Sequence, residues 1–472
     1  MKHFDLIVIG SGPGGYVAAI RASQLGMQAA VVERAELGGI CLNWGCIPTK
    51  ALLKSAQVYN YTQHASDYGI KVEGSVTPDF EAVIKRSRSV SEMMSKGVQF
   101  LLKKNNVTVI EGFGKIEKNM AQVESALSVV AVKTTSNEER YTADHIILAT
   151  GARSRQLPHI PQDGKKIIGY REALTLPQLP TSMVVMGSGA IGSEFAYFYA
   201  SMGTQVTIVE YLPNLVPVED EEISSHLGRA FRKKGIKVIT SASVENVDTA
   251  GELCKVTIKD SKEKITEIEC EIVLSAVGVT TNVEGIGLEE YGVTVANSKV
   301  VVDDFYRTNC EGIYAIGDIV HGPALAHVAS HEALVCVEKI VGLDAHPINY
   351  NLIPGCTYTS PEIASAGITE QACTEQGREV LIGKFPFTAS GKATASGNRD
   401  GMVKVIFDKQ TNEWIGCHLI GDNVTEMISG AVVAMNKKTT GKDILHSVHP
   451  HPTLSEAIME ATAAAYGEVI HL

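Results

Sequence analysis

The chain has 472 residues, of which 44% are hydrophobic and 20% are charged, and its formal net charge is −11. This length exceeds what a single hydrophobic core holds, so about three domains are expected. The acidic balance argues against a nucleic-acid partner, because binding to a phosphate backbone depends on Lys and Arg. No apolar run approaches the roughly 18 residues that a membrane helix needs, so we expect no membrane association.

The nine cysteines indicate a cellular compartment. Their number is odd, and all but two stand singly along the chain. This usage is typical of a reducing environment in which most thiols do not pair. The apolar run at residues 6–9 is too short for the core of a signal peptide. We therefore expect a cytoplasmic protein.

Residues 5–33, DLIVIGSGPGGYVAAIRASQLGMQAAVVE, predict a strand, a helix and a second strand. A glycine-rich turn of the form G-x-G-x-x-G joins the first two at Gly10, Gly12 and Gly15, and Glu33 ends the segment. Such a turn lets the backbone approach a pyrophosphate, which the N–H groups of the helix N-terminus then bind, and the acid can accept from a ribose hydroxyl. The segment predicts a dinucleotide site.

Residues 36–53, ELGGICLNWGCIPTKALL, contain Cys41 and Cys46. A zinc site would need a second cysteine pair of matching spacing, which the sequence lacks, and a stabilising disulfide is at odds with a reducing compartment. These arguments favour a redox-active pair. On an ideal helix, residues five apart lie roughly 8–9 Å apart, beyond the roughly 7 Å limit for a disulfide. The backbone must therefore leave helical form between the two thiols.

A new helix is expected to begin near Ile47, because Pro48 suits a first helical turn. Cys46 would lie just before its N-terminus, where the helix dipole favours a thiolate. Lys50 is then either a surface lysine or a cation beside the electron acceptor. Residues 79–104 predict a further helix that packs by one face.

Residues 182–210, SMVVMGSGAIGSEFAYFYASMGTQVTIVE, repeat the first pattern, with Gly187, Gly189, Gly192 and Glu210 in the corresponding positions. A single match would be weak evidence, but two with the same strand, helix and acid are not. Glu210 would repel a 2′-phosphate, so this second site should prefer NAD to NADP. Two such sites imply two cofactors that exchange electrons, and a flavin suits one of them. The pattern does not say which copy holds it.

Two short strand-like segments end in small residues: HIILATG at residues 145–151 and IYAIGD at residues 313–318. We expect both to return to the first sheet. Asp318, at the carboxyl end of the second, is either a ligand for a cofactor hydroxyl or a solvated loop acid.

The C-terminal segment SVHPHPTLSEA carries His449, His451 and Glu456. Thiol exchange needs a base, for which an imidazole is suited, and a carboxylate can orient that base. Alternatively, Thr453 and Glu456 form an S/T-x-x-E capping box at the start of a helix. The residues alone leave both interpretations open.

These motifs together resemble the flavoprotein pyridine nucleotide-disulfide oxidoreductases over essentially the whole chain, and among them the members that oxidise dihydrolipoyl groups. The resemblance implies an α/β protein with two Rossmann-like dinucleotide-binding domains, for FAD and NAD, and a C-terminal α+β dimerisation domain. Residues 1–150 would form the FAD domain with its redox disulfide, 151–280 the NAD domain, 281–345 a segment that completes the FAD domain, and 346–472 the dimerisation domain.

The resemblance also implies residue roles. Residues that would face FAD are Gly10, Gly12, Gly15, Glu33, Lys50, Gly151 and Asp318, and those that would face NAD are Gly187, Gly189, Gly192, Glu210 and Gly278. Cys46 would meet the flavin, and Cys41 would exchange with substrate. Lys50 would pair with Glu194. His451 would be the base, oriented by Glu456, although Pro450 departs from the smaller residue that is common in the family and would stiffen its approach.

The implied activity is oxidation of protein-bound dihydrolipoamide to lipoamide, with reduction of NAD+ to NADH. The implied partners are a dihydrolipoyl group on an acyltransferase of a 2-oxoacid dehydrogenase complex or on a glycine-cleavage carrier protein, and a second copy of the chain. No metal is expected. The alternatives are a reductase of another disulfide such as glutathione, a docking component and a redox sensor without turnover. Glu210 argues against the first and His451 against the last, and docking would be the main role only if Cys41 and Cys46 proved redox-inert.

Overall fold

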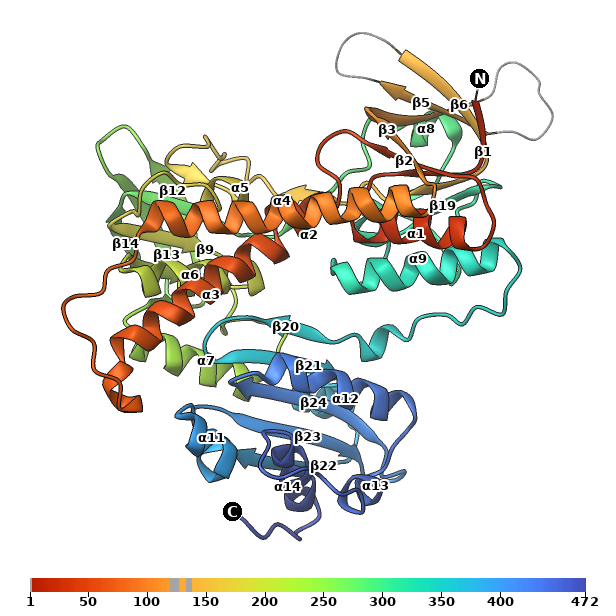
Figure 1. Ribbon diagram of the computed structural model, residues 1–472. Coiled ribbons are helices and arrows are strands. Elements are labelled where there is room, and N and C mark those ends of the chain that lie inside the picture. Colours follow the sequence, from red (N-terminus) through yellow and green to blue (C-terminus); the bar gives the residue numbers. More distant parts are fainter. Residues whose placement is uncertain (1, 119–126, 133–137) are drawn as a thin grey trace. The chain divides into compact units, whose positions relative to one another are not determined.

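The computed structural model describes residues 2–118, 127–132 and 138–472 (Figure 1). The chain folds into two compact units, each made of three segments. The first comprises Met1–Ala51, Ile84–Arg155 and Val279–Ile348, and the second comprises Leu52–Val83, Gln156–Gly278 and Asn349–Leu472.

The first unit is built on a sheet in the order β3-β2-β1-β6-β5-β4, with β19 also paired to β6. Strands β3, β2, β1, β6 and β19 run parallel, whereas β4 and β5 continue the sheet antiparallel. Their bounds are β1 Lys2–Ile9, β2 Ala29–Glu33, β3 Thr108–Glu111, β4 Phe113–Glu117, β5 Leu127–Val132, β6 Glu138–Leu148 and β19 Ile313–Ala315. Both segments predicted to return to the first sheet do so, as the end of β6 and as β19.

Helices cover this sheet because its parallel strands are apolar on both faces. Helices α1 (Pro13–Gln24) and α9 (Ala326–Ile340) pack against one another (Figure 1). Residues 36–53, called the redox segment below, include α2 (Gly39–Trp44) and the start of α3 (Cys46–Gln63). The predicted helix at residues 79–104 is confirmed as α4 (Phe80–Lys104). The remaining small elements are β7 Ala152–Ser154, β16 Val279–Thr281, α8 Leu288–Tyr291, β17 Val295–Ala296, β18 Lys299–Val300 and η2 Gly317–Ile319.

The second unit contains a parallel sheet in the order β11-β10-β9-β15-β8. Beside it lies a three-stranded antiparallel sheet, and the two share an apolar core that includes Val184, Val256 and Val273. The elements are β8 Ile167–Ile168, α5 Tyr170–Ala173, β9 Ser182–Met186, α6 Ala190–Met202, β10 Gln205–Val209, α7 Glu221–Lys233, β11 Lys237–Ile239, β12 Ala242–Asp248, β13 Cys254–Asp260, β14 Ile265–Cys270 and β15 Ile272–Ser275.

The C-terminal part of the second unit is an antiparallel sheet in the order β20-β21-β24-β23-β22, with helices packed against it. Its elements are η3 Tyr350–Leu352, β20 Gly355–Thr357, β21 Glu362–Gly367, α10 Glu370–Glu375, β22 Val380–Pro386, η4 Phe387–Ala389, α11 Gly391–Ser396, β23 Met402–Asp408, β24 Trp414–Gly421, α12 Val424–Asn436, α13 Gly441–Leu445 and α14 Glu456–Ala465. A short helix, η1, spans Ala65–Tyr68.

This architecture confirms the predicted fold class. Each glycine-rich repeat forms a strand, helix and strand of a parallel sheet, and an α+β region follows. Within the described parts of the chain, no helix combines the length and apolar character that a membrane crossing requires.

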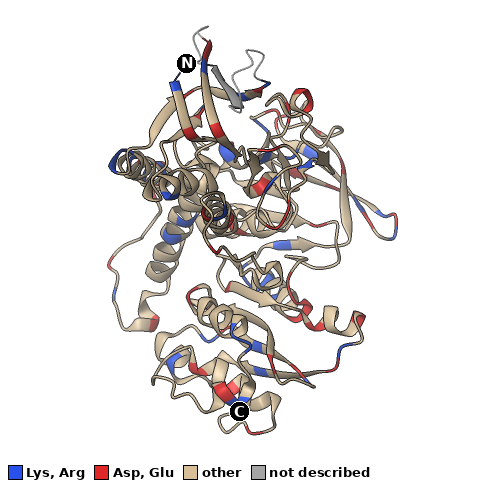
Figure 2. Cartoon of the chain, turned by 90° about the vertical axis from the view of Figure 1, so that its right-hand side faces the viewer, with Lys and Arg blue, Asp and Glu red and all other residues tan. Residues whose placement is uncertain are grey.

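Acidic and basic residues are interspersed along the chain (Figure 2), and one group of them is buried. Lys404 in β23 is 1% exposed, and its Nζ lies 2.8 Å from an oxygen of Asp220, which is fully buried. Nζ also lies 2.5 Å from the Glu370 carboxylate. Because Asp220 caps α7 and Glu370 begins α10, this cluster ties three elements of the second unit together.

Candidate active site

The first glycine-rich turn leaves open space in front of a helix N-terminus. Gly10 has φ +101°, and a Cβ there would lie 2.3 Å from the Ala149 carbonyl oxygen. A Cβ on Gly15 would lie 1.8 Å from the Gly10 carbonyl oxygen, so both positions require glycine. A Cβ on Gly12 would meet nothing within 4 Å. Gly12 is the N-cap of α1 and has no side chain, so the first N–H groups of the helix face a space that fits a pyrophosphate.

Glu33 closes this turn from the end of β2. One carboxylate oxygen accepts from the Ser11 N–H at 2.9 Å and from the Ser11 hydroxyl at 2.6 Å, and the other accepts from the Ala35 N–H at 2.9 Å. Ser11 is an unpredicted member of the site. Its signal in the sequence is that both repeats read G-S-G.

The second turn has the same construction. Gly187 has φ +92°, and a Cβ there would lie 2.6 Å from the Ala276 carbonyl oxygen, while a Cβ on Gly192 would lie 2.1 Å from that of Gly187. Gly189, the N-cap of α6, again has open space around its missing Cβ. Gly278 has φ +104° and lies three residues after β15, the neighbour of β9 in the sheet.

Glu210 accepts from the Ser188 N–H and hydroxyl, both at 2.7 Å, and from the Leu212 N–H at 2.8 Å. Its exposure is 6%, whereas Glu33 is only half-buried. The two repeats thus share one hydrogen-bond pattern, with the second carboxylate held deeper. Each set of residues fits the adenosine and pyrophosphate part of a dinucleotide.

Gly151 and Asp318 belong to the first unit. Gly151 follows β6 and has φ +68°, and Asp318 lies in η2 after β19. Because β6 and β19 are parallel neighbours, their carboxyl ends meet at one edge of the sheet. Burial raises the pKa of the Asp318 carboxyl, and the charge of Lys299 partly opposes this.

The two cysteines lie on either side of a break between two helices. Cys41 is in α2, which ends at Trp44; Gly45 leaves helical geometry with φ −143° and ψ −114°; and Cys46 begins α3. The predicted departure from helical form is confirmed, and the new helix begins at Cys46, one residue before the position that we expected.

The thiols of Cys41 and Cys46 are near enough to influence one another, with Cys41 half-buried and Cys46 exposed. Interaction with Cys46, together with burial, raises the pKa of Cys41 far above its usual range, and the charge of Lys50 opposes this. Cys46 is exposed and begins α3, where the helix dipole favours a thiolate, so a negative charge is better placed there than on the half-buried Cys41. This asymmetry suits a pair in which one sulfur leaves as a thiolate.

Glu194 in α6 is 4% exposed, and its carboxylate accepts from the Tyr358 N–H at 3.0 Å. A buried carboxylate needs such partners. Lys50 belongs to the first unit and Glu194 to the second, so their pairing stays a prediction.

His451 and Glu456 are in contact, and Glu456 also binds a backbone N–H. Thr453 and Glu456 do not form the capping box, because α14 begins at Glu456 with Ser455 as its N-cap. The Oε1 of Glu456 lies 2.9 Å from His451 Nδ1, and its Oε2 accepts from the Thr453 N–H at 2.7 Å. Burial alone would raise the pKa of Glu456, but the Thr453 N–H and His451 lower it below its usual value. Nδ1 is thus engaged, and the imidazole, whose residue is exposed, can offer Nε2 to a thiol. His449 instead bonds the Ser447 carbonyl oxygen through Nδ1 at 2.9 Å.

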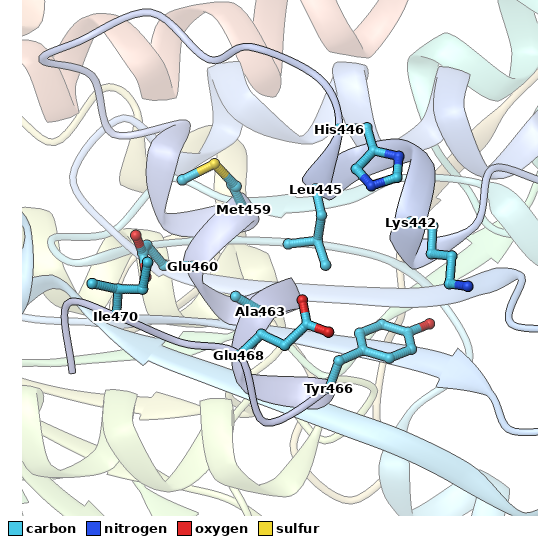
Figure 3. Close-up of a pocket in the computed structure, with 9 residues that line it drawn as sticks. All are labelled: Lys442, Leu445, His446, Met459, Glu460, Ala463, Tyr466, Glu468 and Ile470. Carbon is cyan, nitrogen blue, oxygen red and sulfur yellow. The ribbon is translucent and has the colours of Figure 1, made fainter.

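A separate pocket of about 430 Å³ lies between α13, α14 and the C-terminal residues (Figure 3). Its polar lining includes Lys442, His446, Glu460 and Glu468. It contains none of the predicted site residues.

Comparison with known proteins agrees with this geometry. Residues 4–333 match the family model for pyridine nucleotide-disulphide oxidoreductases, and residues 353–462 match the model for the dimerisation domain of these proteins. The chain belongs to the pyridine nucleotide-disulphide oxidoreductase family.

Two similar members of the family have the same name. The chain is 51% identical over 478 residues to the dihydrolipoyl dehydrogenase of Rhizobium etli, covering 100% of this chain and 99% of the relative. It is 42% identical to the dihydrolipoyl dehydrogenase of Bacillus subtilis, covering 99% of each. Its structure is similar to the crystal structure of LpdA from Mycobacterium tuberculosis, with a TM-score of 0.90, 26% identity and coverage of 98% of this chain and 99% of that chain.

Proposed function

We propose that this chain oxidises protein-bound dihydrolipoyl groups to the lipoyl disulfide and reduces NAD+, through Cys41, Cys46 and FAD. The observation that carries the proposal is the thiol pair itself, which lies on either side of a helix break with the exposed Cys46 at the start of α3. The relatives named dihydrolipoyl dehydrogenase support the choice of substrate.

The two glycine-rich turns would hold the two cofactors. In the first unit, α1, Glu33, Gly151 and Asp318 would bind FAD, and in the second unit, α6, Glu210 and Gly278 would bind NAD. When bound, FAD accepts the electron pair from the thiols, and NAD+ takes it on as a hydride. The 6% exposure of Glu210 supports NAD over NADP, because a 2′-phosphate there would meet a buried carboxylate.

In the proposed exchange, the pair begins as a disulfide. A dihydrolipoyl thiolate attacks the Cys41 sulfur, which breaks the bond to Cys46 and releases Cys46 as a thiolate. The second dihydrolipoyl sulfur then attacks the first, closes the lipoyl disulfide and expels Cys41, which takes up a proton. The substrate has lost two electrons and two protons, and the cysteine pair has gained two electrons and one proton.

His451 would hold the remaining proton at Nε2, because Glu456 engages Nδ1. We propose that the protein is a homodimer in which the tail of one subunit serves the cysteines of the other. The family's dimerisation domain supports the dimer. Lys50, paired with Glu194, would place a positive charge beside the flavin.

We propose the domain limits 1–150, 151–280, 281–345 and 346–472, and a cytoplasmic location. The proposed partners are lipoyl-bearing proteins, either an acyltransferase of a 2-oxoacid dehydrogenase complex or a glycine-cleavage carrier protein.

The test is an anaerobic titration of the purified protein with dihydrolipoamide, followed by addition of NAD+. Two-electron reduction should produce a long-wavelength absorption band, and NADH should form on addition of NAD+. Cys46→Ser should lose both signals, whereas Cys310→Ser, which removes a half-buried thiol outside the pair, should keep them. A spectrum that NADH alters and dihydrolipoamide does not would refute the lipoyl assignment and favour another disulfide.

A further inference from the structure

Helix α4 donates hydrogen bonds to the backbone of the redox segment from four of its side chains. Each reaches a carbonyl oxygen between residues 37 and 51, and all belong to the first unit. The bonds are Arg86 Nη1 to Ala51 at 2.8 Å, Ser87 Oγ to Pro48 at 3.0 Å, Arg88 Nη1 to Asn43 at 2.5 Å and Ser95 Oγ to Leu37 at 2.9 Å. Helix α4 is predicted to pack by one face, and these four side chains contact the redox segment.

Arg88 makes one of these hydrogen bonds and a second contact at the break itself. Its guanidinium carbon lies 4.2 Å from the centroid of the Trp44 ring, and its Nη1 binds the Asn43 carbonyl oxygen. Asn43 and Trp44 are the last residues of α2, where carbonyl groups have no partner within the helix and a cation is favourable. Arg88 therefore caps α2 directly before the non-helical Gly45 and the first residue of α3, Cys46.

The contacts of Arg88 at the end of α2 affect how far apart the two thiols can move. Cys41 is within α2 and Cys46 begins α3, so the distance between their sulfur atoms depends on the torsion angles at Gly45. Glycine resists rotation least of all residues. A planar guanidinium that stacks on one residue and bonds its neighbour restricts that rotation more than a point charge would.

We propose that Arg88 is a positioning residue for the redox pair, which it serves by holding the end of α2 and thus the separation of the two sulfur atoms. The inference rests on the proposed redox role of Cys41 and Cys46. The two cations have different effects. The charge of Lys50 lowers the pKa of Cys41, whereas Arg88 restricts the separation of the two sulfur atoms.

The measurable consequence is the equilibrium between dithiol and disulfide. Closing the bond depends on the effective concentration of one thiol at the other, as in any intramolecular step. Without Arg88 the thiols sample more separations, so we expect the disulfide to lose about tenfold in its equilibrium constant. For this two-electron couple, tenfold corresponds to a rise of about 30 mV in midpoint potential.

The experiment equilibrates the holoenzyme with mixtures of oxidised and reduced dithiothreitol. The protein dithiol and the oxidised reagent give the protein disulfide and the reduced reagent, so two electrons and two protons pass between them. Acid quenching, alkylation and mass spectrometry of the peptide that carries both cysteines then give the ratio. The variants are Arg88→Met, which keeps apolar contact with Trp44, and Arg88→Lys, which keeps the charge.

The matched control is Lys96→Met, which removes the same charge from an exposed position on the same helix, where Lys96 pairs with Glu92. We expect a shift of about tenfold for Arg88→Met, a smaller one for Arg88→Lys and less than twofold for the control. Arg88→Met and Arg88→Lys constants equal to that of the wild type would overturn the inference. If Arg88→Met does not fold, Arg88→Lys alone decides on the same criterion. A wild-type pair that never exchanges with dithiothreitol would instead overturn the proposed function, and this inference with it.

Discussion

The substitution Glu456→Gln tests whether the carboxylate of Glu456 orients the catalytic base His451 or only binds the backbone N–H of Thr453. The carboxylate accepts from the Thr453 N–H at 2.7 Å and contacts His451 Nδ1 at 2.9 Å through its other oxygen. Glutamine has one oxygen and one NH2 group. When the oxygen accepts from Thr453, the NH2 group faces Nδ1, which must then accept. The ring proton moves to Nε2, and that nitrogen can no longer receive a proton from a thiol.

The opposite orientation of the glutamine places its NH2 group against the Thr453 N–H. An unsatisfied backbone donor costs about 1–3 kcal/mol, so the first orientation should dominate by about tenfold or more. Loss of a general base costs about 10²- to 10⁴-fold in rate. We therefore expect kcat for dihydrolipoamide oxidation to fall at least tenfold, toward the range of a lost base.

The assay is steady-state NADH formation from dihydrolipoamide across pH, with thermal unfolding measured in parallel. Asp443→Asn is the control, because Asp443 likewise accepts from the N–H of the threonine three residues before it, Thr440, near the start of a helix, but contacts no histidine of the site. Both variants should lose stability, but only Glu456→Gln should lose rate. A Glu456→Gln rate within threefold of the wild type would show that Glu456 only holds the backbone at Thr453.

Other substitutions test the cofactor sites and the buried ion pair. Gly189→Ala has room for its Cβ and should unfold at the wild-type temperature, yet raise KM for NAD+ at least tenfold in steady-state assays, because the methyl group occupies pyrophosphate space. Lys404→Met should lower the free energy of unfolding, measured with urea, by about 3–5 kcal/mol, since it leaves Asp220 buried without its cation. Burial alone would raise the pKa of Asp220, but Lys404 lowers it below its usual value. The stability that the pair contributes is therefore present above the unfolded pKa of the carboxyl and is lost as pH falls through its folded pKa. In Lys404→Met, burial raises the pKa of Asp220 instead, so the loss of stability relative to the wild type should become smaller as pH falls and the carboxyl takes up a proton.

The sequence predicts those parts of the site whose geometry is local. The glycines at the two turns, the break between Cys41 and Cys46 and the carboxylate of Glu456 near His451 all depend on residues within a few positions of one another. Backbone sterics and helix geometry act over this range, so spacing alone carries the information.

Contacts between distant segments could not be predicted in this way. Arg88 reaches Asn43 across 45 residues, and Tyr358 reaches Glu194 across 164. An arginine on a helix reads as a surface residue in a sequence, and a backbone N–H has no sequence signal at all. The division of the chain into two units of three segments each is likewise set by packing rather than by local pattern.

In the two glycine-rich turns, the glycines are local but the acid bonds a serine 22 residues before it. These hydrogen bonds explain why both turns have an acid. A carboxylate has about four acceptor sites, and in each repeat three are taken, two by the serine of G-S-G and one by the N–H two residues after the acid. These bonds fix the carboxylate without neutralising it and leave about one site for a ribose hydroxyl. A neutral amide could not accept all three protein bonds and still accept a fourth. The acid is thus required by the turn as well as by the ligand, which is why the same residue type recurs in two sites that bind different cofactors under the proposed function.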